Sequence, residues 1–597
     1  MSSVPPGPTP SPSRTASDRS AFARRLPLAG VLRPNKPSDI WFKPATSVVV
    51  AAAVPNVTLL VLGRLDLVMY TMAGSFCALY AHNLPYAARA RALAWVVAGM
   101  FASVGIALVT ASLTTSVAVL VAVGAVLAAT QKAVCDATRI GPPGHLIFTF
   151  ISSASLFAPQ RLGDVPGHLA LTAGAGAVAW IVGMAPVLVR PHGPERRAVA
   201  RALNAAAACA ERPDHAAARG GAAAAVHAAW QSLLATGELT KDLTKDLARE
   251  RTGERTGGRG DAARRALARL VVRAEVAIAA PGDADAAQLR GWAAGLRGAG
   301  AVPRPRPVAE GEDELLGIDA EFAAAAEAKP SLWRRIGPGS PVLPVALRTF
   351  VGCALAGYAS LALGIGRPYW ALVTAASLYQ ANVTLTWSRG VQRVVGNLAG
   401  VLVFAAIAPV AHGSQAALVL FCLAFSFGAE ALITRNYWLG SLCVTPMALL
   451  VTEFARFQEA GELITDRVVD TLVGAALGVL AAVVVTNRRA GDHLERALAE
   501  SEAAQEAAER VLAHGAGTLE GARRRLAASL VELRAAVDTA AGEWWQRALP
   551  EERVLAAERA GHRTLAATVR RQESGSVGET EGAGTDGPGD TCGARLG

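Results

Sequence analysis

The sequence predicts an all-α polytopic membrane protein with two repeats of about six transmembrane helices, each followed by a helical cytoplasmic segment. Three observations predict this fold class. The chain of 597 residues has a mean hydropathy of +0.32 and only 18% charged residues, whereas soluble domains carry about 25%. Its apolar residues gather in runs close to the ~20 residues that a helix needs to cross a bilayer. These runs form two groups, separated by a long polar segment.

The first elements along the chain are a basic N-terminal region and the first repeat. Residues 1–43 are rich in Pro, Ser and basic side chains and predict a disordered basic N-terminal region. Residues 44–189 predict the first six-helix membrane repeat, and the Ala/Arg-rich segment 190–342 predicts amphipathic cytoplasmic helices. The apolar runs of the first repeat are 44–63, 66–83, 92–110, 113–130, 145–159 and 168–189.

The second six-helix membrane repeat is predicted over residues 343–486. Residues 487–571 show helical spacing and predict a second cytoplasmic helical segment, and the Gly-rich polar segment 572–597 predicts a disordered tail. The apolar runs of the second repeat are 343–363, 368–386, 394–410, 415–433, 436–452 and 467–486.

Matching intervals in the two groups indicate a duplication. Gly63 precedes Arg89 by 26 residues, and Gly364 precedes Arg389 by 25 residues. Each arginine then leads into a span that contains glycine. An even number of spans in each group predicts a parallel repeat, because both halves then start on the same side of the membrane.

The distribution of basic residues predicts the orientation. The net charge is +10, and the Lys and Arg residues concentrate in alternate loops, in the N-terminal region and in the two long polar segments. Cytoplasmic loops carry such an excess. Both termini and the middle segment are therefore predicted to be cytoplasmic. Arg389 and Arg393 then lie in a tight hairpin on the inner side, where they anchor the topology.

Motifs for enzyme chemistry are absent from the sequence. We find no P-loop, no dinucleotide-binding fingerprint, no HExxH and no GxSxG. The seven cysteines form no CxxC pair, and the ten histidines lack ligand spacing. We therefore expect no enzymatic activity, no cofactor, no metal and no nucleic acid partner. An energy-coupled function would depend on an ion gradient or on a separate subunit.

The segment GRPYWALVTAASLYQANVTLTWSRGVQRVVGNLAGVLV resembles the fusaric acid resistance (FUSC) family, which is related to the aromatic acid exporters. The family pattern here is a span that opens near Tyr-Trp, two arginines, and Gly-Thr before another small-residue span. This chain departs from it at Asn397, where the family usually has Thr. The matching residues are Tyr369, Trp370, Arg389, Arg393 and Gly396.

The resemblance implies a multi-pass exporter of aromatic or amphipathic organic acids in a bacterial plasma membrane, driven by protons. Plant anion channels are distant relatives, so an organic-anion channel is an alternative. A membrane scaffold that acts through its cytoplasmic helices is a third possibility. The expected partners are the lipid bilayer, a small organic anion and, through the apolar faces of the cytoplasmic helices, a second copy of the chain.

Candidate substrate-binding residues lie around the motif. Tyr369, Ser377 and Gln380 fall on one helical face, which predicts a pore lining or, alternatively, contacts between helices. Arg389 and Arg393 are candidates to capture a carboxylate, because guanidinium binds carboxylates in a bidentate manner; anchoring of the topology is the alternative. Arg348 lies one turn inside its span and is a further candidate, unless it extends to the interface.

Two carboxylates are candidates for proton coupling. Glu430 continues a stripe with Ser426 near the inner end of its span, and an ion pair with Arg435 is the alternative. Asp470 shares a helical face with small residues, and pairing with Arg467 is its alternative.

Pro446 lies inside the span 436–452 and marks either a broken helix or a simple kink. Broken spans often lie at the binding sites of transporters.

Overall fold

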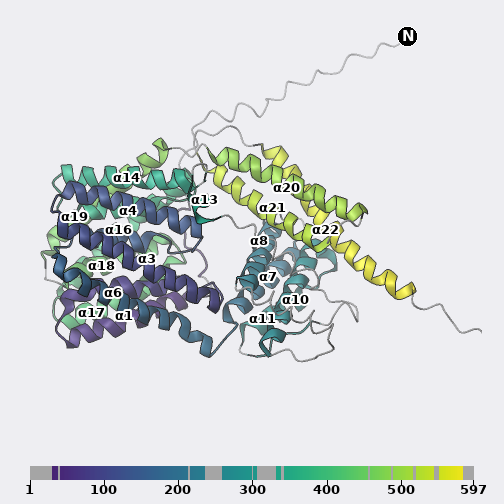
Figure 1. Ribbon diagram of the computed structural model, residues 1–597, viewed down its shortest axis with the longest axis horizontal. Coiled ribbons are helices and arrows are strands. Elements are labelled where there is room, and N and C mark those ends of the chain that lie inside the picture. The colour runs from purple at the N-terminus through teal and green to yellow at the C-terminus, as the bar shows by residue number, and fades with distance from the viewer. Residues whose placement is uncertain are drawn as a thin grey trace, which may run out of the picture.

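The computed structural model consists of a membrane bundle and a set of helices outside it, joined at one end of the bundle (Figure 1). All regular structure in the part of the chain that it describes is helical. The structure describes residues 28, 30–37, 40–212, 216–235, 259–298, 300–305, 331–337, 340, 342–454, 458–485, 489–514, 519–543 and 550–582.

The membrane bundle contains two sets of six apolar helical segments in chain order. The first set is α1 (Phe42–Val61), α2 (Val68–Ser75) with the flanking 3₁₀ turns Leu65–Leu67 and Phe76–Leu79, α3 (Tyr86–Leu113), α4 (Val117–Thr138), α5 (Leu146–Leu156) and α6 (Val165–Met184). The second set is α14 (Val342–Ala362), α15 (Pro368–Leu378), α16 (Val383–Ala411), α17 (Gln415–Ile433), α18 (Tyr437–Glu453) and α19 (Ala460–Val484).

Eight segments among the described residues are long and apolar enough to cross a membrane, so the chain is a polytopic membrane protein. They are α1, α3, α4, the stretch Leu162–Leu188 around α6, α14, α16, α17 and α19. The other predicted runs form shorter helices. An 11-residue helix such as α5 or α15 is about 16 Å long, roughly half the hydrocarbon thickness of a bilayer. The prediction of twelve full-length spans is therefore wrong for these segments, because apolar runs count residues and not unbroken helix.

Contacts between helix ends show that the short segments still return the chain from one end of the bundle to the other. The Arg89 guanidinium, at the start of α3, donates to the Gly183 carbonyl at the end of α6 (3.1 Å). The Arg348 guanidinium, near the start of α14, donates to the Val485 carbonyl just beyond α19. Helices α1 and α3 both start at this end of the bundle, so α1 leads the chain to the opposite end. Residues 65–79 then return the chain to the end where α3 starts. We call this end the junction end and the opposite one the far end.

The predicted hairpin around Arg389 and Arg393 is wrong. The chain turns earlier, at residues 379–382, and α16 begins at Val383, where the Asn382 side chain accepts a hydrogen bond from the Leu385 N–H (2.9 Å). Both arginines therefore lie within the first turns of α16. Charged residues next to an apolar run predict a loop, but a helix packed inside protein also accommodates them, and α16 therefore begins before both arginines.

The helices outside the membrane form two groups, which we call the extramembrane helices. The first group is α7 (Gly193–Glu211), α8 (Ala216–Leu234), α10 (Arg259–Ala279) and α11 (Ala286–Arg297), and the short helix α13 (Leu332–Ile336) follows it. The second group is α20 (Arg489–His514), α21 (Leu519–Ala541) and α22 (Glu551–Gly582). Thus α22 runs into the segment predicted to be a disordered tail.

Glu275 of α10 connects the two extramembrane groups. Its carboxylate accepts a hydrogen bond from the Trp230 indole of α8 (2.7 Å) and forms an ion pair with Arg523 of α21 (3.0 Å). All three side chains are largely buried. Both groups lie at the junction end of the bundle (Figure 1), as the even number of predicted spans requires.

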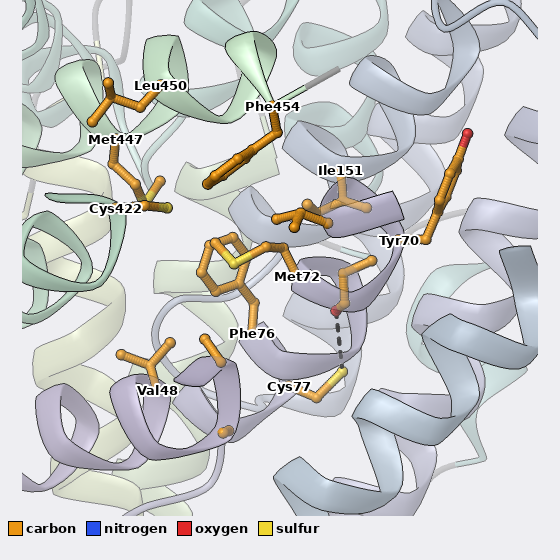
Figure 2. Packing of buried hydrophobic residues seen from close by; sticks show 14 of the residues in the cluster. Val48, Tyr70, Met72, Phe76, Cys77, Ile151, Cys422, Met447, Leu450 and Phe454 are labelled. Atoms are coloured by element: carbon orange, nitrogen blue, oxygen red, sulfur yellow. Dashed lines mark hydrogen bonds between the residues drawn. The ribbon is translucent and has the colours of Figure 1, made fainter. Parts of the chain in front are cut away.

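The largest apolar cluster joins the two halves of the bundle. Figure 2 shows Val48, Met72 and Phe76 of the first half in the same cluster as Cys422 and Met447 of the second. Their side chains are almost fully buried. The halves therefore share one core and form a single bundle.

Part of the predicted disordered N-terminal region packs on the junction end. The carbonyls of Val31 and Leu32 accept hydrogen bonds from the side chains of Asn436 (3.0 Å) and Trp438 (3.0 Å). The Asn35 N–H donates to the carbonyl of Arg435 (2.8 Å). The prediction of disorder is therefore wrong for these residues, and residues 1–27 lie outside the described part of the chain.

Candidate anion-binding site

Close helix packing brings α15, α16, α18 and α19 together in the second half of the bundle. A Cβ atom on Gly396 of α16 would lie 2.5 Å from the Trp438 carbonyl of α18. A Cβ atom on Gly474 of α19 would lie 2.4 Å from the Ala371 carbonyl of α15. Only glycine permits these approaches, so the small residues set the geometry of the polar groups between the helices.

This packing gives a testable prediction. Gly474→Ala is expected to destabilise the protein by about 1–3 kcal/mol, because the added methyl group must push α15 away from α19. Thermal unfolding of the detergent-solubilised protein measures the effect. Gly461→Ala on the same helix is the matched control, since its Cβ would meet nothing within 4 Å. Equal melting temperatures for the two variants would contradict the packing.

Asn397 links three helices at the centre of this group. Its amide donates to the Thr471 hydroxyl of α19 (3.0 Å), and its carbonyl oxygen accepts from the Thr445 hydroxyl of α18 (2.6 Å). The side chain is fully enclosed. The Asn397 amide donates one hydrogen bond and accepts another from separate atoms. The shorter side chain of threonine has a single hydroxyl for both roles. The departure from the family pattern at this position therefore has a structural role.

Arg467 of α19 is the most unusual charged residue of the bundle. Its side chain is 1% exposed, yet its three guanidinium nitrogens have no hydrogen-bond partner among the described residues. A buried cation without a partner costs several kcal/mol. Such an arrangement is therefore expected where an anion binds.

Arginines and aromatic rings alternate around Arg467. The Trp370 ring centroid lies 5.1 Å from the guanidinium carbon of Arg467 and 5.3 Å from that of Arg367. The Tyr437 ring lies 3.5 Å from the guanidinium carbon of Arg389, and its hydroxyl accepts a hydrogen bond from Arg393 (3.1 Å). These six residues, Arg367, Trp370, Arg467, Arg393, Tyr437 and Arg389, are called the arginine–aromatic series below.

The arginine–aromatic series extends from one end of the bundle to the other. Arg367 precedes α15 at the far end and forms an ion pair with Asp466 (2.7 Å). Arg467 comes early in α19, which also starts at the far end. Tyr437 begins α18 and Arg389 lies early in α16, both at the junction end. Guanidinium groups and rings therefore follow one another along the membrane normal, with the Asn397 bridge between Arg467 and Arg393.

Asp470 lies beside Arg467 on the next turn of α19. Its Oδ1 accepts a hydrogen bond from the Ser360 hydroxyl of α14 (2.6 Å), and its buried Oδ2 has no partner among the described residues. The predicted alternative, an ion pair with Arg467, is not formed within 4.0 Å, although the two charges are electrostatic neighbours. A carboxylate and a guanidinium, each with unused hydrogen-bonding atoms, thus share one buried site.

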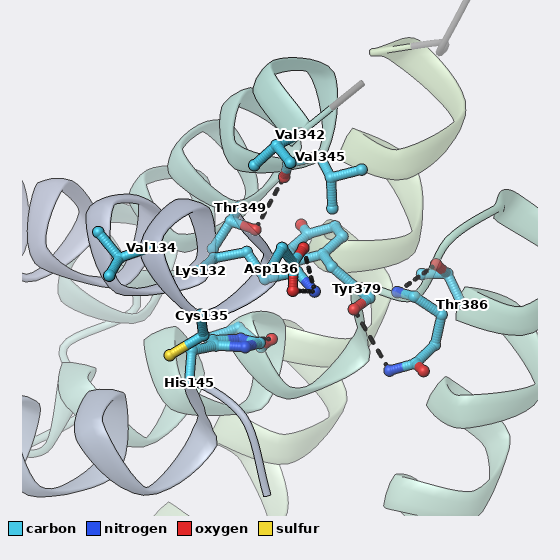
Figure 3. A network of polar contacts seen from close by, with 12 residues as sticks. Lys132, Val134, Cys135, Asp136, His145, Val342, Val345, Thr349, Tyr379 and Thr386 are labelled. Atoms are coloured by element: carbon cyan, nitrogen blue, oxygen red, sulfur yellow. Dashed lines mark hydrogen bonds and ion pairs between the residues drawn. The ribbon is translucent and has the colours of Figure 1, made fainter. Parts of the chain in front are cut away.

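Three other predicted substrate-binding residues lie around this site. Tyr369 is buried, with its ring 5.6 Å from those of Phe157 and Trp370. Ser377 is buried and donates to the Thr374 carbonyl (2.7 Å). Gln380 is half-buried in the turn before α16, where its N–H donates to the Thr386 hydroxyl (3.2 Å). Figure 3 labels Thr386 and Tyr379, which lie on either side of this turn. The structure thus brings Tyr369 and Ser377 to the series and leaves Gln380 at its junction end.

The structure pairs Arg348 with a carboxylate from outside the membrane. Its guanidinium forms a bidentate ion pair with Glu543, just after α21, at 2.8 and 2.7 Å. Both side chains are 0% exposed. The charge of Arg348 is therefore satisfied within the protein, at the junction between the bundle and the extramembrane helices.

Glu430 and Pro446 lie apart from the unpaired guanidinium of Arg467. Glu430 is on α17, which packs on α1 of the first half; its side chain is half-buried and forms no ion pair with Arg435 or another cation among the described residues. Helix α18 continues through Pro446 from Tyr437 to Glu453, so the helix is not broken there. The Leu442 carbonyl, whose helical partner the proline lacks, faces Gly400 of α16.

Sequence reasoning missed Arg467 and Tyr437 as members of the site. Arg467 is the first residue of the run 467–486, where the sequence predicts for it only a pairing with Asp470. The signal was present, because Arg467, Asp470, Thr471 and Gly474 recur at helical spacing. Only the packing shows that this face is turned into the bundle.

Fold and site together define a polytopic membrane protein with a buried cationic site in its second half. Residues 354–481, which hold most of this site, match the protein family described as "Fusaric acid resistance protein-like". The chain therefore contains a fusaric acid resistance-like domain, as the resemblance of the motif around Arg389 and Arg393 predicted.

A relative in Bacillus subtilis (strain 168) has the name "Uncharacterized membrane protein YvaC". It is 31% identical over 208 residues, which are 34% of this chain and 32% of the relative. The chain thus spans about a third of the length of the curated relative that it matches. No solved structure matches the chain.

Proposed function

We propose that this protein is a secondary transporter that exports aromatic or amphipathic organic acids across the plasma membrane of a bacterium. The observation that carries the proposal is Arg467, whose buried guanidinium has no hydrogen-bond partner among the described residues. It lies 5.1 Å from the Trp370 ring and is an electrostatic neighbour of Arg393. An organic anion supplies the missing charge and the missing hydrogen-bond acceptors.

The chemistry of the series favours a substrate that is both flat and acidic. A carboxylate fits Arg467 or Arg393, because guanidinium binds carboxylate oxygens in pairs. An aromatic ring of the substrate fits against Trp370 or Tyr437, which already pack face-on with guanidinium groups. The predicted substrate-binding role is therefore proposed for Arg389, Arg393 and Tyr369, and Arg467 joins them.

The proposed orientation places the junction end in the cytoplasm. The extramembrane helices and the N-terminal region carry much of the basic charge of the chain, and such charge stays on the cytoplasmic side. Substrate would then enter near Arg389 and leave near Arg367. The segment around Val31 and Leu32 covers the cytoplasmic entrance next to Tyr437, through its hydrogen bonds to Asn436 and Trp438.

Helix contacts support the predicted duplication, which we propose as the origin of the two halves. Within the halves, α2 packs on α6 as α15 does on α19, and α3 packs on α5 as α16 does on α18. Between the halves, α1 packs on α17 and α14 packs on α4. In the two sets of six, α14 corresponds to α1 and α17 corresponds to α4. The contact of α1 with α17 is therefore equivalent to the contact of α14 with α4, as a parallel repeat requires.

Proton coupling is proposed for Asp470, with Glu430 as a second candidate. Asp470 competes with an incoming substrate carboxylate for the charge of Arg467, because both anions lie next to the same guanidinium. The protonation state of Asp470 and the occupancy of the anion site at Arg467 are therefore linked, which is what coupling of the proton flux to the anion flux requires. Glu430 lies outside this competition and would act through the first half.

Flux measured in liposomes tests the proposal. The purified protein is reconstituted, and uptake of benzoate, cinnamate and salicylate is followed with and without an imposed pH gradient. We expect saturable flux of the acids, accelerated by the gradient, and no flux of the neutral control benzyl alcohol above that of empty liposomes. Flux that is independent of the gradient would favour the organic-anion channel. Absence of flux for every acid in the panel would contradict both forms of transport and favour the scaffold.

A further inference from the structure

A second basic cavity lies between the membrane bundle and the extramembrane helices, on the opposite half from the arginine–aromatic series. It has a volume of about 1110 Å³. Its walls come from the starts of α1 and α3, the residues that follow α6, the first turns of α7 and the end of α11. The cavity therefore lies at the level where the bundle leaves the membrane.

The lining of the cavity is strongly cationic. No Asp or Glu belongs to it. Glu195, in the first turn of α7, is an electrostatic neighbour of Arg197 and lies behind the wall. The cationic lining residues are Lys43, Arg190, Arg196, Arg197, Arg201 and Arg297.

Arg196 and Arg197 make hydrogen bonds within the wall. The exposed side chains of Arg190, Arg201 and Arg297 line the cavity. The guanidinium of Arg196 donates to the carbonyls of Leu296 (3.1 Å), Gly300 (2.9 Å) and Gly295 (3.2 Å), and thereby fixes the end of α11 against α7. The side chains of Arg190, Arg201 and Arg297 form no hydrogen bond or ion pair with any described residue. Burial lowers the pKa of Arg197, with the nearby arginines Arg201 and Arg190 adding to the effect. The cavity thus holds several cationic groups whose charges the protein leaves uncompensated.

The rim of the cavity is apolar on the membrane side. Phe42 and Val189 line it and are 44% and 81% exposed. Leu188, next to Val189, is 87% exposed. These exposed apolar side chains lie at the start of α1 and just beyond α6, so the cavity combines a cationic lining with an apolar rim beside two membrane helices.

We propose that this cavity binds the phosphate group of an anionic phospholipid, with the acyl chains against Phe42 and Val189. Basic pockets at the cytoplasmic side of membrane helices suit anionic headgroups, because each Lys or Arg adds electrostatic attraction for the phosphate. A soluble phosphate ester has the same phosphate group, but it has no acyl chains to pack against the apolar rim. The site is independent of the transported substrate, and its occupant would connect α1, α3 and α6 to α7.

The test uses the full-length protein in nanodiscs of phosphatidylcholine with increasing phosphatidylglycerol, and native mass spectrometry counts the retained anionic lipid. Arg190→Gln combined with Arg201→Gln is expected to reduce retention about tenfold or more. The matched control combines Arg161→Gln with Arg212→Gln, which removes two charges from side chains that are also exposed but lie outside the cavity, and is expected to retain the lipid like the unchanged protein. Arg196 is left in place because it supports the wall.

Inorganic phosphate and glycerol 3-phosphate, added in solution at millimolar concentrations, distinguish the two sources of the phosphate group. We expect neither to displace phosphatidylglycerol. Displacement by both would overturn the assignment to a lipid and point to a soluble phosphate ester. Equal retention by the Arg190/Arg201 variant and its control would overturn the site itself. Because the measurement counts bound lipid, its outcome does not depend on transport.

Discussion

Replacement of Arg467 by glutamine is expected to reduce the flux of aromatic carboxylates by about 100-fold or more, which corresponds to about 2.7 kcal/mol of lost interaction. The charge-assisted hydrogen bonds to the substrate carboxylate disappear with the guanidinium. The protein itself is expected to melt at the same temperature or higher. The reason is that the 1% exposed guanidinium has no partner among the described residues, and glutamine relieves the cost of burying its charge.

The opposite signs of these two effects make the test specific. A merely structural arginine would lose stability and flux together. Arg467→Lys keeps the charge but cannot bind a carboxylate with two parallel bonds, so we expect intermediate flux and a weaker apparent affinity. Arg161→Gln, an exposed arginine outside the series, is the control for a simple loss of charge. Unchanged flux in Arg467→Gln would remove the central argument for the proposed function.

The sequence was a good guide to the membrane class and a poorer guide to the lengths of the spans. Hydropathy located all the apolar segments, because burial in lipid or protein leaves the same signature in composition. It could not show that α15 ends at Leu378, since Gln380 and Asn382 are the only strongly polar residues up to Thr386. Only the cap at Asn382 marks the new helix, and a single Asn in an apolar run is a weak signal.

The candidate site was predicted in part. The motif names Tyr369, Arg389 and Arg393 on neighbouring segments of the chain, and the structure places Tyr369 at the far end of the series and Arg389 at its junction end. Arg467 comes from α19, more than seventy residues further on, and no local pattern states which helix it faces. The prediction of Arg348 as a substrate-binding residue shows another limit of sequence analysis. A buried arginine near the end of a span can bind a substrate or a carboxylate of the extramembrane helices, and the sequence does not distinguish the two. Glu543, its partner, lies 195 residues away.

Loss of the ion pair between Arg348 and Glu543 is expected to have the second large effect. Glu543→Gln is expected to destabilise the contact between the bundle and the C-terminal helices by about 3–5 kcal/mol, because it leaves the charge of Arg348 buried and uncompensated. Both partners are 0% exposed, so water cannot replace the carboxylate. Limited proteolysis between α21 and α22 and thermal unfolding in detergent measure the loss.

A double replacement separates the ion pair from its surroundings. Arg348→Met combined with Glu543→Leu removes both charges and keeps most of the buried volume, so we expect it to recover much of the stability that Glu543→Gln loses. Arg553→Gln, whose ion pairs with Glu502 and Glu495 are exposed, is the matched control and is expected to change stability by less than about 1 kcal/mol.

The same pair decides whether the C-terminal helices influence transport. Glu543 directly follows Gly542, whose carbonyl accepts hydrogen bonds from the N–H and the hydroxyl of Thr384 at the start of α16. Helix α16 carries Arg389 and Arg393, so loss of the ion pair loosens the helix that presents them to the substrate. We expect Glu543→Gln to lower flux and the double replacement to restore part of it. Full flux in Glu543→Gln at a reduced melting temperature would show that the junction serves stability alone.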